Sequence, residues 1–327
     1  MSADYEYYRD AFAGRLMPFA FVDLDRFDQN ARHVLERARG RKIAIASKSV
    51  RCIEMLRRIQ AVSPDFHAIM AYCAREAVFL VEHGFDNILV AYPVLSELRH
   101  CGYLEALRAG KTLCLMIDSV EHVEYLEALG AETGTTLPVC IDVDMSSSYP
   151  GLHFGVRRSS VTTGEQAVRV WRAIQESPHV SLDGVMGYEA QVAGLSDRQP
   201  GRGAMGPIIR ALKRRSIREV AARRKEVVDA LRAEGAALRF VNGGGTGSVE
   251  FTILEDCVTE VTVGSGFYCS GLFDYYDNFK HEPAAGFAVE IVRQPTDTIY
   301  TCHGGGYIAS GAAGPDKLPV PWLPLGA

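Results

Sequence analysis

The chain has 327 residues, of which 47% are hydrophobic and 23% are charged, so it is long enough to bury one large core and a smaller one. Its formal net charge of -5 argues against a general nucleic-acid-binding protein, which would carry a basic excess. No apolar run is long enough to span a bilayer, and the polar, acidic residues 1–10 lack the basic and apolar regions of a signal peptide. The expected partner is therefore a small molecule, with neither nucleic acid nor a membrane involved.

Cysteine usage indicates the cellular compartment. The eight cysteines are scattered without any C-x-x-C pair, and most lie in apolar stretches. We interpret them as reduced core thiols, which predicts a cytoplasmic protein.

The first predicted elements are a strand at residues 19–24 and a helix that runs to Ala38, with Asp25 as its N-cap. From Lys42 a regular alternation of apolar strands and helices begins. The expected strands are 43–47, 67–72, 87–92, 112–117, 138–143, 182–188, 238–242 and 260–263. The expected helices are 53–61, 75–83, 96–109, 120–129, 165–176, 208–233 and 249–254.

Eight strands that alternate with helices are typical of a (β/α)₈ barrel of the TIM type. An open doubly wound sheet is the alternative. The barrel is favoured because the number of strands reaches eight and no strand is followed by the dinucleotide-binding fingerprint.

After Gly264 the pattern changes to alternating strands at 287–292 and 298–302, separated by turns rich in glycine and proline. We therefore predict two domains, a barrel at residues 19–266 and a small β-rich domain at 267–327 that also recruits residues 1–24. The apolar, proline-rich stretch 321–327 has no closing strand, so we expect the second domain to be truncated.

One lysine stands at the end of the first barrel strand. Residues 42–47 form an apolar run that delivers Lys48 at its carboxyl end, where ligands gather in parallel α/β folds. An isolated lysine at this position would more often mark the point where a strand meets solvent. The residues after strands seven and eight change that balance.

Glycine-rich loops follow the seventh and eighth strands, at residues 242–248 and 263–266. Backbone N–H groups freed of side chains can surround an anion, and these two loops are the commonest phosphate site of (β/α)₈ barrels. The alternative is that the glycines make tight turns. Two such loops on adjacent strands favour phosphate, and a phosphate together with a lysine suggests pyridoxal 5'-phosphate.

Six short motifs in fixed order then give the chain a family resemblance, which extends from about residue 19 to the end. They are residues 46–48, 142–144, 153–156, 184–189, 242–246 and 261–266. The chain resembles the fold-type III pyridoxal-phosphate enzymes, in which an alanine racemase N-terminal barrel is joined to a D-serine dehydratase-like domain. D-threonine aldolases and D-serine dehydratases have this organisation.

The resemblance implies roles for individual residues. Lys48 would be the catalytic lysine that forms the Schiff base, and Tyr188 would lie against the pyridine ring. Tyr188 would otherwise be a core tyrosine at a strand end. The implied cofactor-binding residues in and beside the loops are Asn242, Gly244, Gly245, Thr246, Gly264 and Ser265.

Two positions depart from the racemase pattern. His153 falls where the racemases place an arginine near the cofactor's phenolic oxygen, and Arg157 follows four residues later, so either could take that role. Thr262 falls where the racemases hold an arginine against the pyridine nitrogen. A neutral group there permits more electron withdrawal by the ring, from which elimination and retro-aldol chemistry would benefit.

A divalent metal, zinc or manganese, is implied by the aldolases and dehydratases of this family. The available candidates are Cys302, His303 and His281, and the first two are adjacent on a predicted strand, so their side chains would face opposite ways. We assign no metal ligand. A run of basic residues on helix 208–233 is interpreted as a solvated outer face, and it comprises Lys213, Arg214, Arg215, Arg218, Arg223, Arg224 and Lys225.

The resemblance predicts a pyridoxal-phosphate lyase, an aldolase or a dehydratase, that acts on a D-β-hydroxy amino acid such as D-threonine or D-serine, as a homodimer. An amino-acid racemase is the first alternative and needs a second base from the β-rich domain. Loose candidates for that base are Tyr268, Tyr275, Tyr276 and Tyr307. A non-catalytic pyridoxal-phosphate-binding protein is the second alternative.

Overall fold

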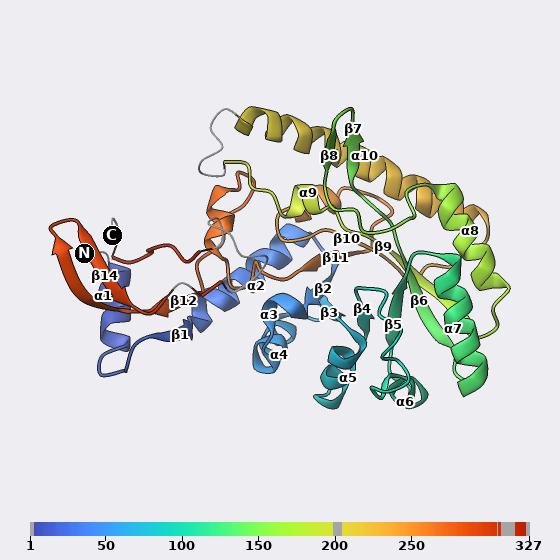
Figure 1. The fold of residues 1–327 in the computed structure, drawn as a ribbon, viewed down its shortest axis with the longest axis horizontal. Coiled ribbons are helices and arrows are strands. Elements are labelled where there is room, and N and C mark those ends of the chain that lie inside the picture. The colour runs from blue at the N-terminus through green and yellow to red at the C-terminus, as the bar shows by residue number, and fades with distance from the viewer. Residues whose placement is uncertain (1–2, 199–204, 306, 309–317, 325–327) are drawn as a thin grey trace.

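The computed structural model describes residues 3–198, 205–305, 307–308 and 318–324. Its main body is a closed barrel of eight parallel strands surrounded by helices (Figure 1). The strands follow one another around the barrel in chain order, and the last strand pairs with the first. The predicted (β/α)₈ barrel is confirmed, and each of the eight predicted barrel strands is present.

The barrel strands are short and apolar, and most are buried on both faces because helices cover the outside and side chains fill the inside. In order around the barrel they are β2 (Lys42–Ala46), β3 (Phe66–Ala71), β4 (Ile88–Val90), β5 (Leu113–Ile117), β6 (Leu137–Asp142), β9 (Val180–Gly187), β10 (Phe240–Gly243) and β11 (Glu260–Val263).

Helices follow the strands, and three of them are single turns at the carboxyl ends of strands. The single-turn helices are α3 (Ser47–Val50), α9 (Ala190–Ala193) and α11 (Val249–Thr252). The longer ones are α2 (Leu24–Ala38), α4 (Ile53–Val62), α5 (Ala74–Glu82), α6 (Tyr103–Arg108), α7 (Val120–Thr133), α8 (Gly164–Gln175) and α10 (Gly206–Ala233).

The N-terminal ends of helices α2 and α6 differ from the predictions for physical reasons. The N-cap of α2 is Asp23 instead of Asp25, because the Asp23 carboxylate accepts hydrogen bonds from the backbone N–H groups of Asp25 and Arg26. Helix α6 begins seven residues later than the predicted start at residue 96, since turns precede it and Gly102 adopts a positive φ of 83° at its N-cap.

A small apolar cluster fills the barrel lumen. It consists of Leu89, Cys114, Met116, Cys140, Met186 and Phe240, with Met70 and Tyr188 packed against it. We call the end of the lumen formed by the carboxyl ends of the strands the mouth, and the opposite end the floor. Because the lumen between them is packed, the polar groups of the mouth and of the floor can serve different purposes.

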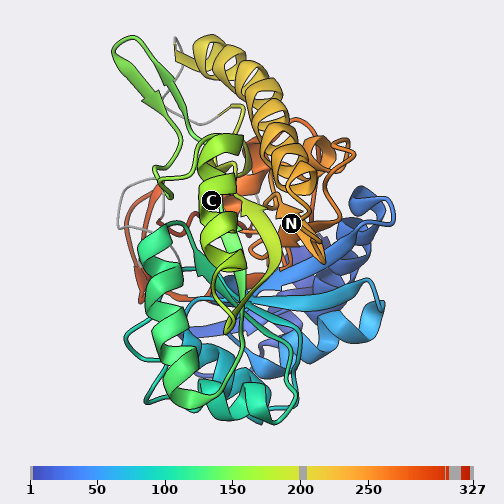
Figure 2. The same cartoon turned by 90° about the vertical axis from the view of Figure 1, so that its right-hand side faces the viewer.

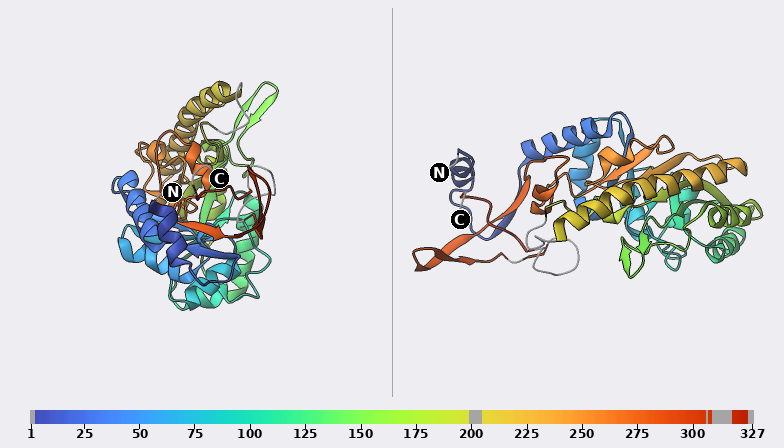
Figure 3. Two further views of the ribbon diagram at one scale, coloured as in Figure 1. Left: turned by 90° about the vertical axis from the view of Figure 1, so that its left-hand side faces the viewer. Right: turned by 90° about the horizontal axis from the view of Figure 1, so that it is seen from above.

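A β-rich region extends from one side of the barrel (Figures 1 and 3). Strand β1 (Phe19–Val22), which follows helix α1 (Ala3–Ala11), pairs antiparallel with β12 (Ala285–Ala288). Strands β13 (Glu290–Thr296) and β14 (Ile299–His303) form a hairpin in which every residue is exposed. The predicted strand at 287–292 is therefore split between β12 and β13. The apolar stretch 321–327 lies partly outside the described residues.

A second hairpin was not predicted. Strands β7 (Ser147–Tyr149) and β8 (Leu152–Phe154) rise beside helix α10 (Figure 2), where the side chains of Ser147 and Tyr149 donate hydrogen bonds to Glu219. Across the described part of the chain, no helix has both the length and the apolar character that crossing a membrane would require.

Candidate active site at the barrel mouth

Lys48 lies in α3, the single helical turn that follows strand β2. Ser47 anchors this turn by donating its hydroxyl to the Met70 carbonyl at 3.0 Å, and Arg51 ends it in the left-handed conformation, with φ 49°. The Lys48 side chain is exposed, and within the described residues it forms neither an ion pair nor a hydrogen bond. Its amine is therefore available to a ligand.

The glycine loop after β11 packs directly against this lysine turn. A Cβ atom on Gly264 would come within 2.7 Å of Ser49 Oγ and 2.9 Å of the Ala46 Cβ, which is closer than real contacts allow. Only glycine permits this approach, because it lacks a side chain. The loop predicted to bind phosphate and the turn that carries Lys48 are thus brought together, with Ser265 half-buried beside them.

The glycine loop after β10 lies against Tyr188. A Cβ atom on Gly245 would meet the Ala193 Cβ at 2.7 Å and Tyr188 Cε2 at 3.2 Å. The two loops are joined, since the backbone N–H of Gly266 donates to Thr246 Oγ1 at 3.1 Å. The mouth therefore combines both loops, Tyr188 and Lys48.

Some backbone N–H groups of these loops already donate hydrogen bonds within the protein. The N–H of Gly244 donates to Glu189 Oε2 at 3.2 Å, and the N–H of Gly245 donates to Ser248 Oγ at 3.1 Å. The helix after Gly247, α11, is a single turn. A phosphate at this mouth would thus take its N–H donors from other positions in the two loops.

A buried ion pair supports the first loop from behind. The Glu189 carboxylate accepts from Arg224 Nη2 at 2.8 Å, from Ser248 Oγ at 2.9 Å and from Thr252 Oγ1. Arg224 is fully buried and also pairs with Glu255. The prediction that the basic run on α10 is solvated throughout is therefore wrong at Arg224.

It is also wrong at Lys213, which is 4% exposed. The Lys213 amine donates to the Leu195 carbonyl at 2.8 Å and to Asp197 Oδ1 at 2.7 Å. Lys213 and Arg224 share a face of α10 with buried Val220, which places them toward the protein interior.

A guanidinium–carboxylate pair that sequence reasoning missed lies close to Tyr188. Arg158 Nε and Nη2 lie 3.2 and 3.1 Å from Asp142 Oδ2, and the guanidinium carbon is 5.8 Å from the centre of the Tyr188 ring and 5.0 Å from that of Tyr92. The backbone N–H of Arg158 donates to Asp144 at 2.7 Å, which fixes the start of its side chain. Its signal was the adjacent basic pair of residues 157–158.

Asp142 is only 3% exposed, and its second oxygen, Oδ1, is buried without a hydrogen-bond partner among the described residues. Burial raises the pKa of Asp142 to about 6, against the opposing charge of Arg158. A buried polar atom with no partner in the chain indicates a place where a ligand can bond.

The two residues predicted near the phenolic oxygen lie in different environments. His153 is half-buried in β8, its Nδ1 is 3.2 Å from Ser148 Oγ, and its Nε2 is buried without a partner among the described residues. Arg157 is exposed. The guanidinium that the structure brings to Tyr188 belongs to Arg158.

Tyr188 itself is a neutral phenol over the ordinary pH range. Burial, and secondarily the charge of Glu189, raises its pKa to about 12. Its ring can therefore contribute a flat face and a hydroxyl donor, but it does not act as an anionic base without help.

Asn242 and Thr262 lie deeper, inside the barrel. The Thr262 hydroxyl donates to Asn242 Oδ1 at 2.9 Å, and Asn242 Nδ2 donates to Glu260 Oε1 at 2.5 Å. Both residues are at most 7% exposed. They therefore form the polar base of the mouth, below its rim.

The candidate metal ligands are not brought together. Cys302 and His303 are exposed on β14, whereas His281 is buried with Nδ1 2.9 Å from the Gly266 carbonyl. Burial lowers the pKa of His281 to about 4, so it is a neutral hydrogen-bonding group behind the loops. In the ranges that the structure describes, no group of three or more side chains is arranged as metal ligands.

The tyrosines considered as a racemase base include two that are engaged elsewhere. The Tyr268 hydroxyl donates to the Val50 carbonyl at 2.9 Å, and the buried Tyr276 hydroxyl donates to the Ala193 carbonyl at 2.9 Å. Burial raises the pKa of Tyr268 to about 12.

The mouth thus defines a (β/α)₈ barrel of the class that presents a free lysine amine, a guanidinium–carboxylate pair and two glycine loops to a ligand. Residues 22–270 match the model of the family described as alanine racemase, N-terminal domain. The chain belongs to this family.

Known proteins similar to this chain include two aldolases. The 3-hydroxy-D-aspartate aldolase of Paracoccus denitrificans (strain Pd 1222) is 24% identical over 253 residues, which cover 76% of this chain and 59% of the relative. The D-threonine aldolase of Arthrobacter sp is 23% identical over 270 residues, covering 82% and 64%. The chain therefore spans about three fifths of the length of these curated relatives.

Solved structures share the fold. The D-threonine aldolase from Filomicrobium marinum aligns with a TM-score of 0.74 at 19% identity, covering 90% of this chain and 74% of that one. D-threo-3-hydroxyaspartate dehydratase from Delftia sp. HT23 aligns with a TM-score of 0.71 at 21% identity, covering 87% and 70%. These structural neighbours are fold-type III pyridoxal-phosphate enzymes, as the resemblance in sequence implied.

Proposed function

We propose that the chain carries the cofactor-binding barrel of a pyridoxal-phosphate lyase that acts on a D-β-hydroxy amino acid. The observation that carries the proposal is the free amine of Lys48 beside the Gly264 loop, at the mouth that also holds the Arg158–Asp142 pair. An amine, a phosphate site and a fixed cation are the groups that a phosphorylated pyridine aldehyde needs.

The residues of the mouth fit this cofactor. Lys48 would attach it covalently, the two glycine loops would hold its phosphate, and Tyr188 would support its ring. Arg158 supplies N–H donors for an anionic oxygen, and Asp142 fixes that guanidinium in position. When bound, the cofactor supplies an electron sink for charge that develops on the α-carbon of an amino acid.

As a free amine, Lys48 would be able to take up or deliver a proton on one face of the substrate. The neutral Thr262 beneath the mouth, where a racemase would hold an arginine, supports a lyase over a racemase. The names of the relatives, aldolases and a dehydratase, support β-hydroxy amino acids of D configuration as the substrate class.

The proposal is tested by assaying the full-length protein with D-threonine, 3-hydroxy-D-aspartate, D-serine and D-alanine, with and without manganese or zinc. Aldol cleavage would release an aldehyde and glycine, and elimination would release ammonia and a keto acid. Racemised alanine without either product would establish the racemase alternative. Reversible binding of the cofactor without turnover of any amino acid would establish the non-catalytic alternative.

We also propose the division into a barrel at 19–266 and a β-rich domain at 267–327 with 1–24, which the pairing of β1 with β12 supports. A cytoplasmic location is supported by the eight cysteines, all of which are free thiols. A homodimer is supported by the exposed apolar side chains of the β13–β14 hairpin, and light scattering on the full-length protein tests it.

A further inference from the structure

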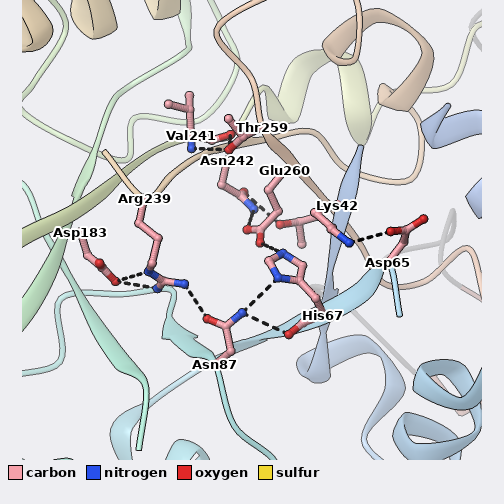
Figure 4. A network of polar contacts seen from close by, with 11 residues as sticks. Lys42, Asp65, His67, Asn87, Asp183, Arg239, Val241, Asn242, Thr259 and Glu260 are labelled. Atoms are coloured by element: carbon pink, nitrogen blue, oxygen red, sulfur yellow. Dashed lines mark hydrogen bonds and ion pairs between the residues drawn. The ribbon is translucent and has the colours of Figure 1, made fainter. Parts of the chain in front are cut away.

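A polar chain runs through the floor of the barrel to the base of the mouth (Figure 4). At the floor, Arg239 donates twice to Asp183 Oδ2, at 2.9 and 2.6 Å, and its Nη1 donates to Asn87 Oδ1 at 2.8 Å. Asn87 Nδ2 then lies 3.3 Å from His67 Nδ1 and 3.1 Å from the His67 carbonyl. The chain continues from His67 into the lumen.

The direction of every hydrogen bond on the floor side follows from Arg239, because a guanidinium only donates. Asn87 must therefore turn its oxygen to Arg239 and its N–H₂ to His67. His67 Nδ1 consequently accepts, so the ring proton is on Nε2 and points to Glu260 Oε2, 2.5 Å away. His67 is thus fixed as a donor toward the lumen.

The direction on the mouth side follows from the hydrogen bond that Glu260 Oε1 accepts from Asn242 Nδ2. Asn242 therefore presents its Nδ2 to Glu260 Oε1, and its Oδ1 is turned toward Thr262. The Thr262 hydroxyl must donate to that oxygen. Toward the mouth, Thr262 Oγ1 then offers only lone pairs, so it can accept a hydrogen bond there but cannot donate one.

We propose that Glu260 and Asn242 are positioning residues that hold the Thr262 hydroxyl as a hydrogen-bond acceptor, so that the site selects a cofactor whose ring nitrogen carries a proton. Thr262 lies on β11, two residues before Gly264 of the glycine loop. In the barrel it pairs with Ala44 of β2, the strand that leads to Lys48. A protonated ring nitrogen is the stronger electron sink. The inference rests on the proposed function and specifies how the chain favours lyase chemistry.

The conservative variant Glu260→Gln is expected to reverse the donor and acceptor roles in the mouth-side half of this hydrogen-bond chain. His67 remains a donor because Arg239 and Asn87 fix it, so the carbonyl oxygen of the new side-chain amide would have to face His67 and its N–H₂ would face Asn242. Asn242 would then rotate and donate to Thr262, and the Thr262 hydroxyl would donate toward the mouth. An unprotonated ring nitrogen would be selected instead.

The test uses the holoenzyme loaded with pyridoxal phosphate that carries ¹⁵N at the ring nitrogen. The ¹⁵N chemical shift distinguishes the two states, since a pyridinium nitrogen resonates far upfield of an unprotonated one. We expect the protonated shift in the wild type, and the downfield shift in Glu260→Gln and in Thr262→Val, which removes the acceptor and keeps the Glu260 charge. Thr262→Ser should restore the wild-type shift.

The matched control is Asp65→Asn, which breaks the exposed Lys42–Asp65 ion pair at the floor. Neither of these residues belongs to the hydrogen-bond chain that ends at Thr262. An unprotonated nitrogen in the wild type, or an unchanged shift in Glu260→Gln, overturns the proposal. The proposal is also overturned if the ¹⁵N shift changes in Glu260→Gln but not in Thr262→Val. That result would mean that the charge of residue 260 acts on the ring nitrogen without the Thr262 hydroxyl. Borohydride reduction and peptide mapping separate this result from failure of the proposed function, which would show as no cofactor on Lys48.

Discussion

The mouth and the floor of the barrel carry the same kinds of side chain but use them differently. At the floor, Arg239, Asn87 and His67 are linked to one another and onward to Asp183 and Glu260. At the mouth, by contrast, Asp142 Oδ1 is buried without a partner among the described residues. A buried polar atom without a partner costs free energy unless a ligand supplies one.

The comparison supports the proposal that the mouth binds a ligand, whereas the floor contributes to stability. Floor groups complete one another, so a ligand would have to break existing hydrogen bonds to enter there. Mouth groups have unused bonding capacity, and the exposed amine of Lys48 adds to it. The polar chain through Asn242 connects the two ends, because hydrogen bonds completed at the floor orient the Thr262 hydroxyl at the mouth.

The largest effect is expected from Lys48→Ala, which removes the amine of the mouth. Cofactor attachment should be lost, and turnover should fall by at least about 10³-fold. Lys42→Ala is the matched control, because Lys42 begins the same strand at the floor end. Absorbance and borohydride labelling measure attachment. Equal loss in both variants would show that the strand matters and the mouth amine does not.

The next largest effect concerns two ion pairs, one behind the mouth and one at the floor. Arg224→Met leaves Glu189 and Glu255 buried without their cation, so the free energy of unfolding should fall by about 3–5 kcal/mol. Asp183→Asn at the floor removes a partly exposed pair and should cost at most about 1 kcal/mol. Urea unfolding measures both. Similar costs would contradict the assignment of Arg224 as a buried support of the Gly244 loop.

A third prediction concerns the pH dependence of stability caused by Asp142. Its folded pKa of about 6 lies above the ordinary value of 3.8, so between these values the folded state binds more protons than the unfolded state, and stability falls as pH rises. The loss amounts to about 3 kcal/mol, at about 1.4 kcal/mol for each pKa unit. It should be complete above about pH 6.

Asp142→Asn removes this dependence, so the stability difference between wild type and variant should change across that window. The difference is the useful quantity, because His281, with its pKa lowered to about 4, gives stability that rises with pH over an overlapping range and is common to both proteins. Chemical denaturation at several pH values measures it. A difference independent of pH would show that Asp142 is ionised throughout.

The barrel was predictable because each buried strand is a short apolar run, and the position of Lys48 followed from the end of the first run. The two glycine loops were predictable for the same reason, since each follows such a strand. Local composition was enough for these features, because each depends on neighbouring residues along the chain.

The missed features depend on residues far apart in sequence. Glu189 and Arg224 are 35 residues apart, and the basic run around Arg224 gave no sign that one member turns inward. Arg158 reaches the mouth because its N–H bonds to Asp144 and its guanidinium to Asp142, across the unpredicted β7–β8 hairpin. Such contacts are set by tertiary packing and are absent from local patterns.

The smallest effect is expected from Gly264→Ala, which tests how closely the glycine loop must approach the lysine turn. The added methyl group would meet Ser49 Oγ at 2.7 Å, so the turn has to move, at a cost of about 1–3 kcal/mol in stability and a weaker hold on the cofactor. Gly271→Ala is the control, since its nearest neighbour is a Val320 methyl group at an ordinary 3.6 Å. Thermal unfolding with and without added pyridoxal phosphate measures both effects. The substitution leaves the floor unchanged, so its effect reports on the mouth. If the Gly264→Ala protein is still stabilised by the cofactor to the same extent, the phosphate is not held at this loop.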